Sequence, residues 1–251
     1  MATLVLHYDF ENYTAGSNTV VNKGSTGSAF NATIGGTSSI TNTDYATGTN
    51  CLSLIGQGTS NGGYLQIPNF KWQTNFLAGS GAWYTICFWY KKKADSITET
   101  NARILDLYYD TNTYFYMYFN SSGNLVFKKN DIYGLIDTTT IVNANVCDGR
   151  WHHFVMTNNN STNNQLYIDG VYTGNFYSAN SGFANTYNYT SCYMGRSSNS
   201  SDYYATELID DFRIYRGSLS AAEISALFAL YNRPSCNIFI GNPPVNLNLF
   251  M

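Results

Sequence analysis

The chain has few charged residues for its length. Lys, Arg, Asp and Glu make up 12% of the 251 residues, and the formal net charge at pH 7 is −3. A general nucleic-acid binder needs a basic face, which this balance does not supply. Basic residues cluster only at 91–93 and 128–129, and we interpret both short runs as solvated strand ends. The sequence therefore predicts no nucleic-acid partner.

Long apolar runs are also missing. No stretch approaches the roughly 18 apolar residues of a membrane-spanning helix, so we expect no membrane insertion. Met1 and Ala2 lead almost directly into the apolar run 4–8, which is typical of a first strand rather than a signal peptide. Several Asn-x-Ser/Thr sequons occur, the first at Asn12, and they indicate an exposed protein only weakly. An exposed protein without a visible export signal predicts a virion, extracellular or cell-surface location.

Metal-binding patterns built on Cys or His are absent too. The five cysteines include no C-x-x-C pair, which argues against a zinc site. Cys87 and Cys192 lie in strand-like apolar runs, where a free thiol acts as a small hydrophobic residue. His152 and His153 are adjacent, so in a strand they point to opposite faces and cannot hold one metal ion together.

Strand-forming sequence is what the chain has in quantity. Aromatic residues make up 16% of the chain, and 22 of them are tyrosines. Runs of β-branched and aromatic residues recur about every 8–12 residues between Gly, Asn, Asp and Ser turns, which is the rhythm of an antiparallel sandwich. The clearest runs are 84–91, 104–108, 114–119, 125–127, 165–172 and 208–215. In the first of them, Ile86, Phe88 and Tyr90 are predicted to share one face, with Cys87 and Trp89 on the other.

Two local signals define a hairpin turn and the one helix. Asp169-Gly170 between apolar runs predicts a tight hairpin, because both residues tolerate positive φ. Ser220 and Glu223 have the spacing of a capping box, in which each side chain bonds the other residue's amide. Ile224, Leu227 and Phe228 then follow on one helical face. We therefore expect an all-β domain with one short C-terminal helix.

Three stretches, in this order, resemble the concanavalin A-like lectin/glucanase superfamily and its laminin G-like (pentraxin-like) branch. They are Trp151-His152-His153-Phe154-Val155, Tyr167-Ile168-Asp169-Gly170 and Ile209-Asp210-Asp211-Phe212-Arg213-Ile214-Tyr215. The resemblance covers about residues 3–232 and implies a jelly-roll sandwich of two antiparallel sheets. We accordingly expect a laminin G-like domain at 1–232 and a Pro-containing apolar tail at 233–251.

The catalytic pattern of the superfamily's glucanases is missing. Those enzymes place carboxylates at alternate positions of one strand, and retaining hydrolysis needs two carboxyl groups about 5 Å apart. Glu207, Asp210 and Asp211 form the one acidic cluster, and its spacing does not match, although Glu207 and Asp211 would share a strand face. We expect instead that one aspartate holds a loop and the other pairs with an arginine such as Arg213. The sequence predicts no enzyme, with glycoside hydrolysis as the minor alternative.

Calcium is the one cofactor that the resemblance suggests. Several relatives hold Ca²⁺ with Asp, Asn and carbonyl oxygens at the rim of the sandwich, and the ion takes six to eight oxygen ligands. Asp9, Glu11 and Asp210 would approach one another if the first and last strands pair. The alternative is that all three are ordinary strand-end residues.

Tyrosines supply the best candidate for a binding surface. A tyrosine ring offers a large apolar face for sugar C–H groups and a polar end. Tyr114 and Tyr116 share one face of a predicted strand, while Tyr203 and Tyr204 follow Asp202 in a polar loop. We predict these five residues as the glycan-binding residues of a non-catalytic module whose partners are glycans or glycoproteins. The alternative is that the rings fill or cover the sandwich.

The tail supports a second hypothesis. Its apolar residues are Ile238, Phe239, Ile240, Leu247, Leu249 and Phe250. Because the domain is complete without it, we expect the tail to dock on a neighbour, with packing on its own domain as the alternative. The protein would then be a structural component of a virus particle (a minor capsid or decorating protein) or of a surface layer. Its partners would be other proteins of the particle, and self-association into an oligomer is a further hypothesis.

Overall fold

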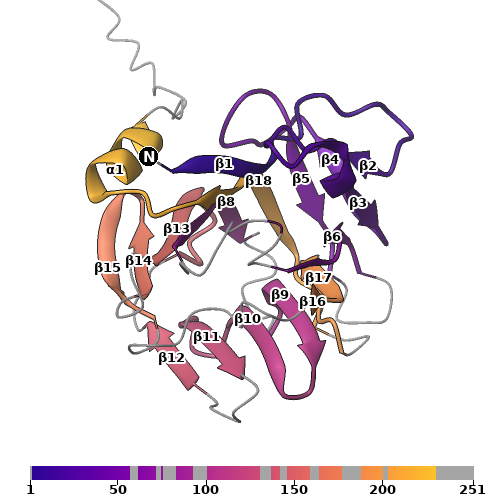
Figure 1. Cartoon of the computed structure of the whole chain (residues 1–251). Helices are drawn as coiled ribbons and strands as arrows, with labels where there is room; N and C mark the ends of the chain where they lie inside the picture. Colours follow the sequence, from indigo (N-terminus) through magenta and orange to yellow (C-terminus); the bar gives the residue numbers. More distant parts are fainter. Residues whose placement is uncertain are drawn as a thin grey trace, which may run out of the picture.

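The computed structural model describes residues 2–56, 62–71, 75, 83–92, 101–130, 137–141, 146–158, 164–176, 188–199 and 203–229. Two large antiparallel sheets account for most of them and pack face to face as a jelly-roll sandwich (Figure 1). The predicted all-β fold class with a single short helix is confirmed.

The first sheet has the strand order β15-β14-β13-β8-β18-β5-β4, and β1 also pairs with β18. Its strands are β1 (Thr3–Tyr8), β4 (Ser39–Thr41), β5 (Cys51–Leu54), β8 (Tyr84–Lys92), β13 (His152–Asn158), β14 (Asn164–Ile168), β15 (Val171–Asn175) and β18 (Glu207–Arg216). The closing strand β18 is central, because β8 lies on one side while β5 and β1 share the other.

The second sheet has the order β12-β11-β10-β9-β17-β6-β3-β2. Its strands are β2 (Thr19–Val20), β3 (Ala32–Gly35), β6 (Tyr64–Ile67), β9 (Arg103–Asp110), β10 (Thr113–Phe119), β11 (Leu125–Asn130), β12 (Asp137–Ile141) and β17 (Ser191–Met194). A small separate sheet pairs β7 (Phe70–Lys71) with β16 (Asn188–Tyr189), and the 3-10 helix η1 spans Gly27–Phe30.

Period-2 alternation builds the core between the sheets. Ile86, Phe88 and Tyr90 of β8 point into the main core, as predicted, and Cys87 belongs to a second apolar cluster on the other face. The thiols of Cys51, Cys87 and Cys192 are buried and form no disulfide among the described residues, while Cys236 lies outside these residues. The basic runs behave differently from the prediction, because Lys92 and Lys129 are only 1% and 4% exposed. Both residues continue a strand, and alternation turns every second side chain inward.

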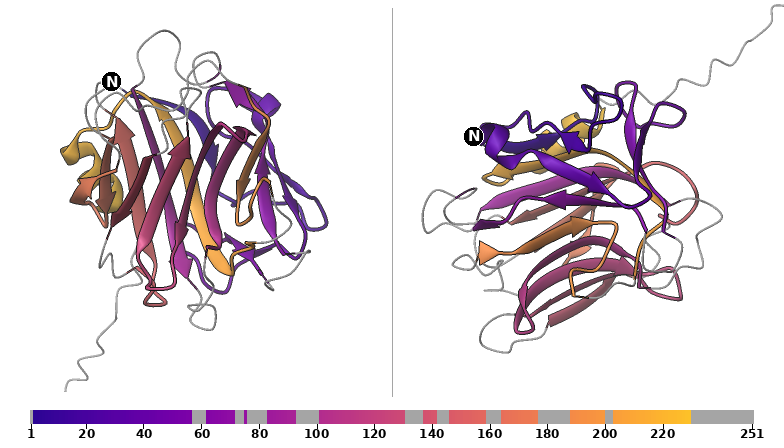
Figure 2. Two further views of the ribbon diagram at one scale, coloured as in Figure 1. Left: turned by 90° about the horizontal axis from the view of Figure 1, so that it is seen from below. Right: turned by 90° about the vertical axis from the view of Figure 1, so that its right-hand side faces the viewer.

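Helix α1 (Ala221–Ala229) covers the outside of the first sheet. The predicted capping box is present: the Ser220 amide donates to Glu223 Oε2 at 2.7 Å, and the Glu223 amide donates to Ser220 Oγ at 3.3 Å. Ile224 and Leu227 pack on an apolar patch of this sheet, which places α1 outside strands β14 and β15 (Figure 2). In the described part of the chain, no helix is long and apolar enough to cross a membrane.

Candidate functional site

Strand β10 presents a row of tyrosines on the outer face of the second sheet. Burial alternates along the strand, so that Phe115 and Met117 enter the core while Tyr114, Tyr116 and Tyr118 stay partly exposed. The rings of Tyr114 and Tyr116 stack with a centroid distance of 5.3 Å and an interplanar angle of 16°. This is the predicted tyrosine row, and it lies on the surface rather than in the core.

The same outer face continues across the neighbouring strands. Asp106 of β9 lies opposite Tyr116 on one side and opposite Tyr193 of β17 on the other. Because paired strands are about 4.8 Å apart, the backbones carrying Tyr116 and Tyr193 are about 10 Å apart. Aromatic rings on both sides therefore flank a single carboxyl group.

Arg103 joins the two groups of tyrosines that the sequence predicted separately. Its guanidinium carbon lies 3.8 Å from the ring centroid of Tyr116 and 5.1 Å from that of Tyr203. Tyr118 completes the cluster at 5.0 Å. Cation–π contacts of this kind hold the loop tyrosine against the strand row.

Arg196 forms a second cluster of the same kind. Its guanidinium carbon lies 4.7 Å from the ring centroid of Tyr193, 4.9 Å from that of Tyr64 and 5.4 Å from that of Tyr204. We call the outer surface that carries both clusters the tyrosine face. It consists of Tyr64, Arg103, Tyr114, Tyr116, Tyr118, Tyr193, Arg196 and Tyr203.

The predicted loop residues have different positions. Tyr203 is 41% exposed and adopts a positive φ of 65°, which turns its ring onto Arg103. Tyr204 is 5% exposed and packs so closely on Gly62 that a Cβ there would lie 2.3 Å from the tyrosine ring. Tyr204 therefore supports Arg196 from below, while Tyr203 is accessible. Asp202 and the six tail residues lie outside the described residues.

Asp106 is a site residue that the sequence did not single out. It is 2% exposed, and burial raises the pKa of its carboxyl to about 6, against the opposing effects of a Ser198 hydrogen bond and the charges of Arg103 and Arg196. Its Oδ1 has no hydrogen-bond partner, and its Oδ2 lies 3.5 Å from Arg103 Nε. The available signal was a carboxylate inside the apolar run 104–107, which is unusual for a buried strand.

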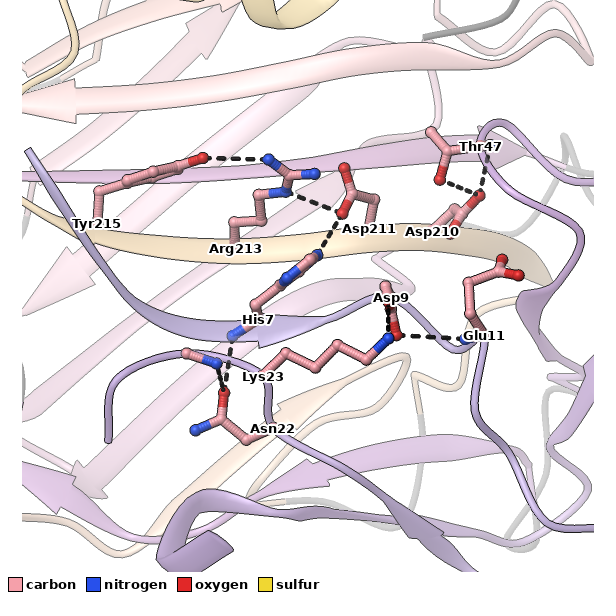
Figure 3. Close-up of polar contacts among 11 residues, drawn as sticks. His7, Asp9, Glu11, Asn22, Lys23, Thr47, Asp210, Asp211, Arg213 and Tyr215 are labelled. Carbon is pink, nitrogen blue, oxygen red and sulfur yellow. Dashed lines mark hydrogen bonds and ion pairs between the residues drawn. The ribbon is translucent and has the colours of Figure 1, made fainter. Parts of the chain in front are cut away.

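The residues predicted to bind calcium are engaged with protein donors, as Figure 3 shows for Asp9 and Asp210. Asp9 forms an ion pair with Lys23, and Glu11 accepts from the amides of Thr49 and Asn50, each at 2.9 Å. Asp210 Oδ2 accepts from the amides of Ala46 and Thr47 at 3.0 and 2.8 Å.

Asp210 is also deeply buried. Burial raises the pKa of its carboxyl to about 8, and neighbouring Asp211 raises it further, while the two amide hydrogen bonds oppose the shift. Within the described ranges, no group of three or more His, Cys, Asp and Glu side chains could hold a metal ion. Asp9, Glu11 and Asp210 are thus each held by separate protein donors, and calcium binding stays a prediction from sequence.

The acidic cluster is built into the fold. Asp210 holds the 46–47 loop, and Asp211 Oδ1 lies 2.8 Å from Arg213 Nε, which are the two roles expected from sequence. Asp211 Oδ1 also lies 2.6 Å from His7 Nε2, a contact that the sequence did not predict. Glu207 is 0% exposed. The prediction that Glu207 and Asp211 share one face of the strand is wrong. A bulge between Asp210 and Arg213 interrupts the pairing with β8, and Asp211 has a φ of 51°.

A pocket beside Asp9 and Lys23, lined also by Phe10, Tyr13 and Val20, has a volume of about 10 Å³. That is room for about one water molecule. A saccharide does not fit there, which leaves the open tyrosine face as the better candidate.

A family profile described as the Concanavalin A-like lectin/glucanases superfamily matches residues 58–225. The chain belongs to this superfamily, as the sequence motifs indicated. A comparison with curated protein sequences gives no match.

Several solved structures have a similar fold. The binding domain of Paraclostridial Mosquitocidal Protein 1 is 17% identical with a TM-score of 0.63, and this chain, 90% of which aligns, covers 52% of that one. Domain 4 of AbnA, a GH43 extracellular arabinanase from Geobacillus stearothermophilus, in complex with arabinotriose, is 18% identical with a TM-score of 0.60. The alignment covers 90% of this chain and 98% of that domain. A structure of botulinum neurotoxin type C, whose cell entry depends on two ganglioside molecules, is 15% identical with a TM-score of 0.65, at 90% and 51% coverage.

These likenesses concern the fold alone, since all three identities are below a fifth. The chain spans about half the length of the toxin structures that it matches.

Proposed function

We propose that this domain is a non-catalytic glycan-recognition module that binds its ligand on the tyrosine face. The observation that carries the proposal is the exposed row Tyr114, Tyr116 and Tyr118, which Arg103 joins to Tyr203. An outer sheet face normally carries small or charged side chains, and such a set of partly exposed aromatic rings marks an interaction surface.

The chemistry of these rings suits saccharides. The apolar faces of Tyr114 and Tyr116 provide flat surfaces for sugar C–H groups, and their hydroxyls provide donors and acceptors beside them. Both rings are already ordered by stacking at 5.3 Å, so binding would cost little additional side-chain entropy.

The superfamily and the neighbouring structures support a binding role. One neighbour is the binding domain of a mosquitocidal protein, and another, domain 4 of an arabinanase, was solved with arabinotriose. Catalysis finds no support in the acidic cluster, since Glu207 is fully buried and Asp211 is held by Arg213 and His7. A glycan-binding role implies an extracellular, cell-surface or virion location, because the glycan ligands would be present there.

A glycan array with the purified domain tests the proposal. We expect binding to a subset of saccharides, and a loss of about tenfold or more in affinity for Tyr116→Ala, because one ring contributes stacking area worth about 1.4 kcal/mol or more. Tyr172→Ala is the matched control, since Tyr172 is 49% exposed on β15 of the other sheet. Absence of binding by folded wild type, or equal losses in both variants, would contradict the proposal.

A further inference from the structure

We infer that the ligand of the tyrosine face is an acidic saccharide, whose carboxylate is bound by Arg196 with Lys128 adding to the attraction. This inference rests on the proposed function and specifies its ligand class. It comes from the positions of the cations on this face and from the small number of carboxylates among the described residues beside them.

Arg196 keeps unused hydrogen-bond donors. It follows Gly195 in the turn after β17 and is partly exposed. Its Nε donates to the Ser197 carbonyl at 3.1 Å, and in the described part of the chain Arg196 has no ion-pair partner. The surrounding rings of Tyr64 and Tyr193 hold the guanidinium plane in place. A fixed guanidinium with free terminal nitrogens matches a carboxylate in a two-point geometry.

Lys128 supplies a second cation from the opposite side. It lies on β11 directly opposite Tyr116, with Nζ 6.0 Å from that ring's centroid. No carboxylate of the described residues pairs with Lys128, whereas Lys23 and Lys91 each form an ion pair with an aspartate. The two cations therefore stand on either side of the aromatic surface that a sugar ring would cover.

The nearby negative charge does not cancel these cations. Among the described side chains, Arg103, Arg196 and Lys128 lie near one carboxyl, Asp106, which is buried beneath the rings, so three positive charges exceed one negative charge even when Asp106 is ionised. Asp110 lies four residues further along β9, about 13 Å from Asp106 at the rise of a strand. That distance exceeds the screening length of about 8–10 Å in physiological salt. In a chain of net charge −3, this face attracts anions.

A matched pair of ligands tests the inference. Oligosaccharides ending in a sialic or uronic acid are compared with their methyl esters, in which the same sugar lacks the charge. We expect the acids to bind at least about tenfold more tightly than the esters, and to weaken as salt is raised. A sulfated neutral oligosaccharide forms a third arm.

Variants locate the charge. Arg196→Gln is expected to lose at least about tenfold in affinity for the acids and to bind the esters as wild type does. Lys128→Gln is expected to show a smaller loss of the same sign. Arg196→Lys keeps the positive charge but lacks the planar guanidinium group that contacts both carboxylate oxygens, so we expect it to bind the acids with intermediate affinity. This variant also tests the inference if Arg196→Gln does not fold. Arg150→Gln is the control, since its side chain is 83% exposed in the turn before β13.

The outcomes separate this inference from the proposed function. Equal binding of acids and esters, with loss in Tyr116→Ala, would overturn the acidic ligand and leave a neutral-glycan module. Binding of the sulfated compound alone would overturn the carboxylate assignment. If no saccharide binds to folded protein, both proposals fail.

Discussion

Two buried carboxyl groups, those of Asp210 and Asp106, have pKa values well above the ordinary value for aspartate. Asp210 is 0% exposed, accepts two amide hydrogen bonds on Oδ2 and has no partner for Oδ1. Burial takes this carboxyl out of bulk water and raises its pKa to about 8, because the two amide hydrogen bonds only partly oppose that effect. The same physics acts more weakly on Asp106, whose pKa of about 6 is held down by two arginines and Ser198.

Asp210→Asn is predicted to stabilise the protein near pH 8. The folded state binds the Asp210 proton more tightly than the unfolded chain does, since its pKa is raised from 3.8 to about 8. The free energy of unfolding of wild type therefore falls as pH rises through this window. Asparagine retains the acceptor for Ala46 and Thr47 but does not titrate. We expect a gain of about 1–3 kcal/mol near pH 8 in urea denaturation, and less near pH 4.

The calcium prediction gives the opposite result in the same experiment. If Asp210 were a ligand, wild type would gain stability on addition of Ca²⁺, and Asp210→Asn would lose both that gain and stability at neutral pH. Denaturation curves with calcium and with a chelator distinguish the two cases. Glu11→Gln is a second test of the predicted ligand set, because Glu11 binds the turn at 49–50 rather than the loop at 46–47 and should lose the calcium effect in the same way if calcium binds.

At the scale of elements, one histidine joins two turns of the first sheet. His152 Nε2 lies 2.9 Å from Asp148 Oδ1 in the turn before β13. His152 Nδ1 lies 2.9 Å from Asp169 Oδ2 in the β14–β15 turn. Burial lowers the pKa of His152, but the hydrogen bonds and charges of Asp169 and Asp148 outweigh it, so the pKa is raised overall.

The His152 contacts predict a pH-dependent stability. A histidine whose folded-state pKa is raised stabilises the protein fully below its unfolded value of 6.5, and this contribution is lost as pH rises through the folded pKa. We therefore expect His152→Gln to lose more free energy of unfolding at about pH 5.5 than at about pH 9. Urea denaturation of wild type and His152→Gln at the two pH values measures the difference. His153→Gln is not a suitable control, because His153 packs against Trp89 in the interior. An equal loss at both values would contradict the prediction.

Elements were predictable from sequence where local chemistry decides them. The Asp169-Gly170 turn has φ values of 52° and 77°, and the capping box at Ser220 is formed, because both depend on residues a few positions apart. The bulge at Asp211 was missed, since the Asp211 side chain contacts His7, which comes from the paired strand β1 and is 204 residues away in the sequence. A strict period of two cannot anticipate an inserted residue.

At the scale of the whole molecule, the tyrosine face is assembled from distant segments. The row Tyr114–Tyr116 was predictable because its period is local. The contributions of Tyr64, Arg103 and Arg196 were not, since β6, β9 and the turn after β17 become neighbours only through the strand order of the second sheet. The superfamily motifs define that architecture, but they lie mainly in strands of the first sheet, away from this face.

The tail tests whether recognition and docking are separate properties of the chain. The described core closes within residues 2–229, where α1 already covers the outer patch at Cys87, Val155 and Tyr167. Removing residues 233–251 is therefore expected to leave the melting temperature within about 2 °C of wild type and glycan binding unchanged. Thermal denaturation and the glycan assay measure both.

If the chain is instead a particle or surface-layer component that docks through Ile238, Phe239 and Ile240, the same truncation abolishes that association while the fold persists. A truncated protein that melts early would instead place the tail within the domain, and the boundary at residue 232 would be wrong.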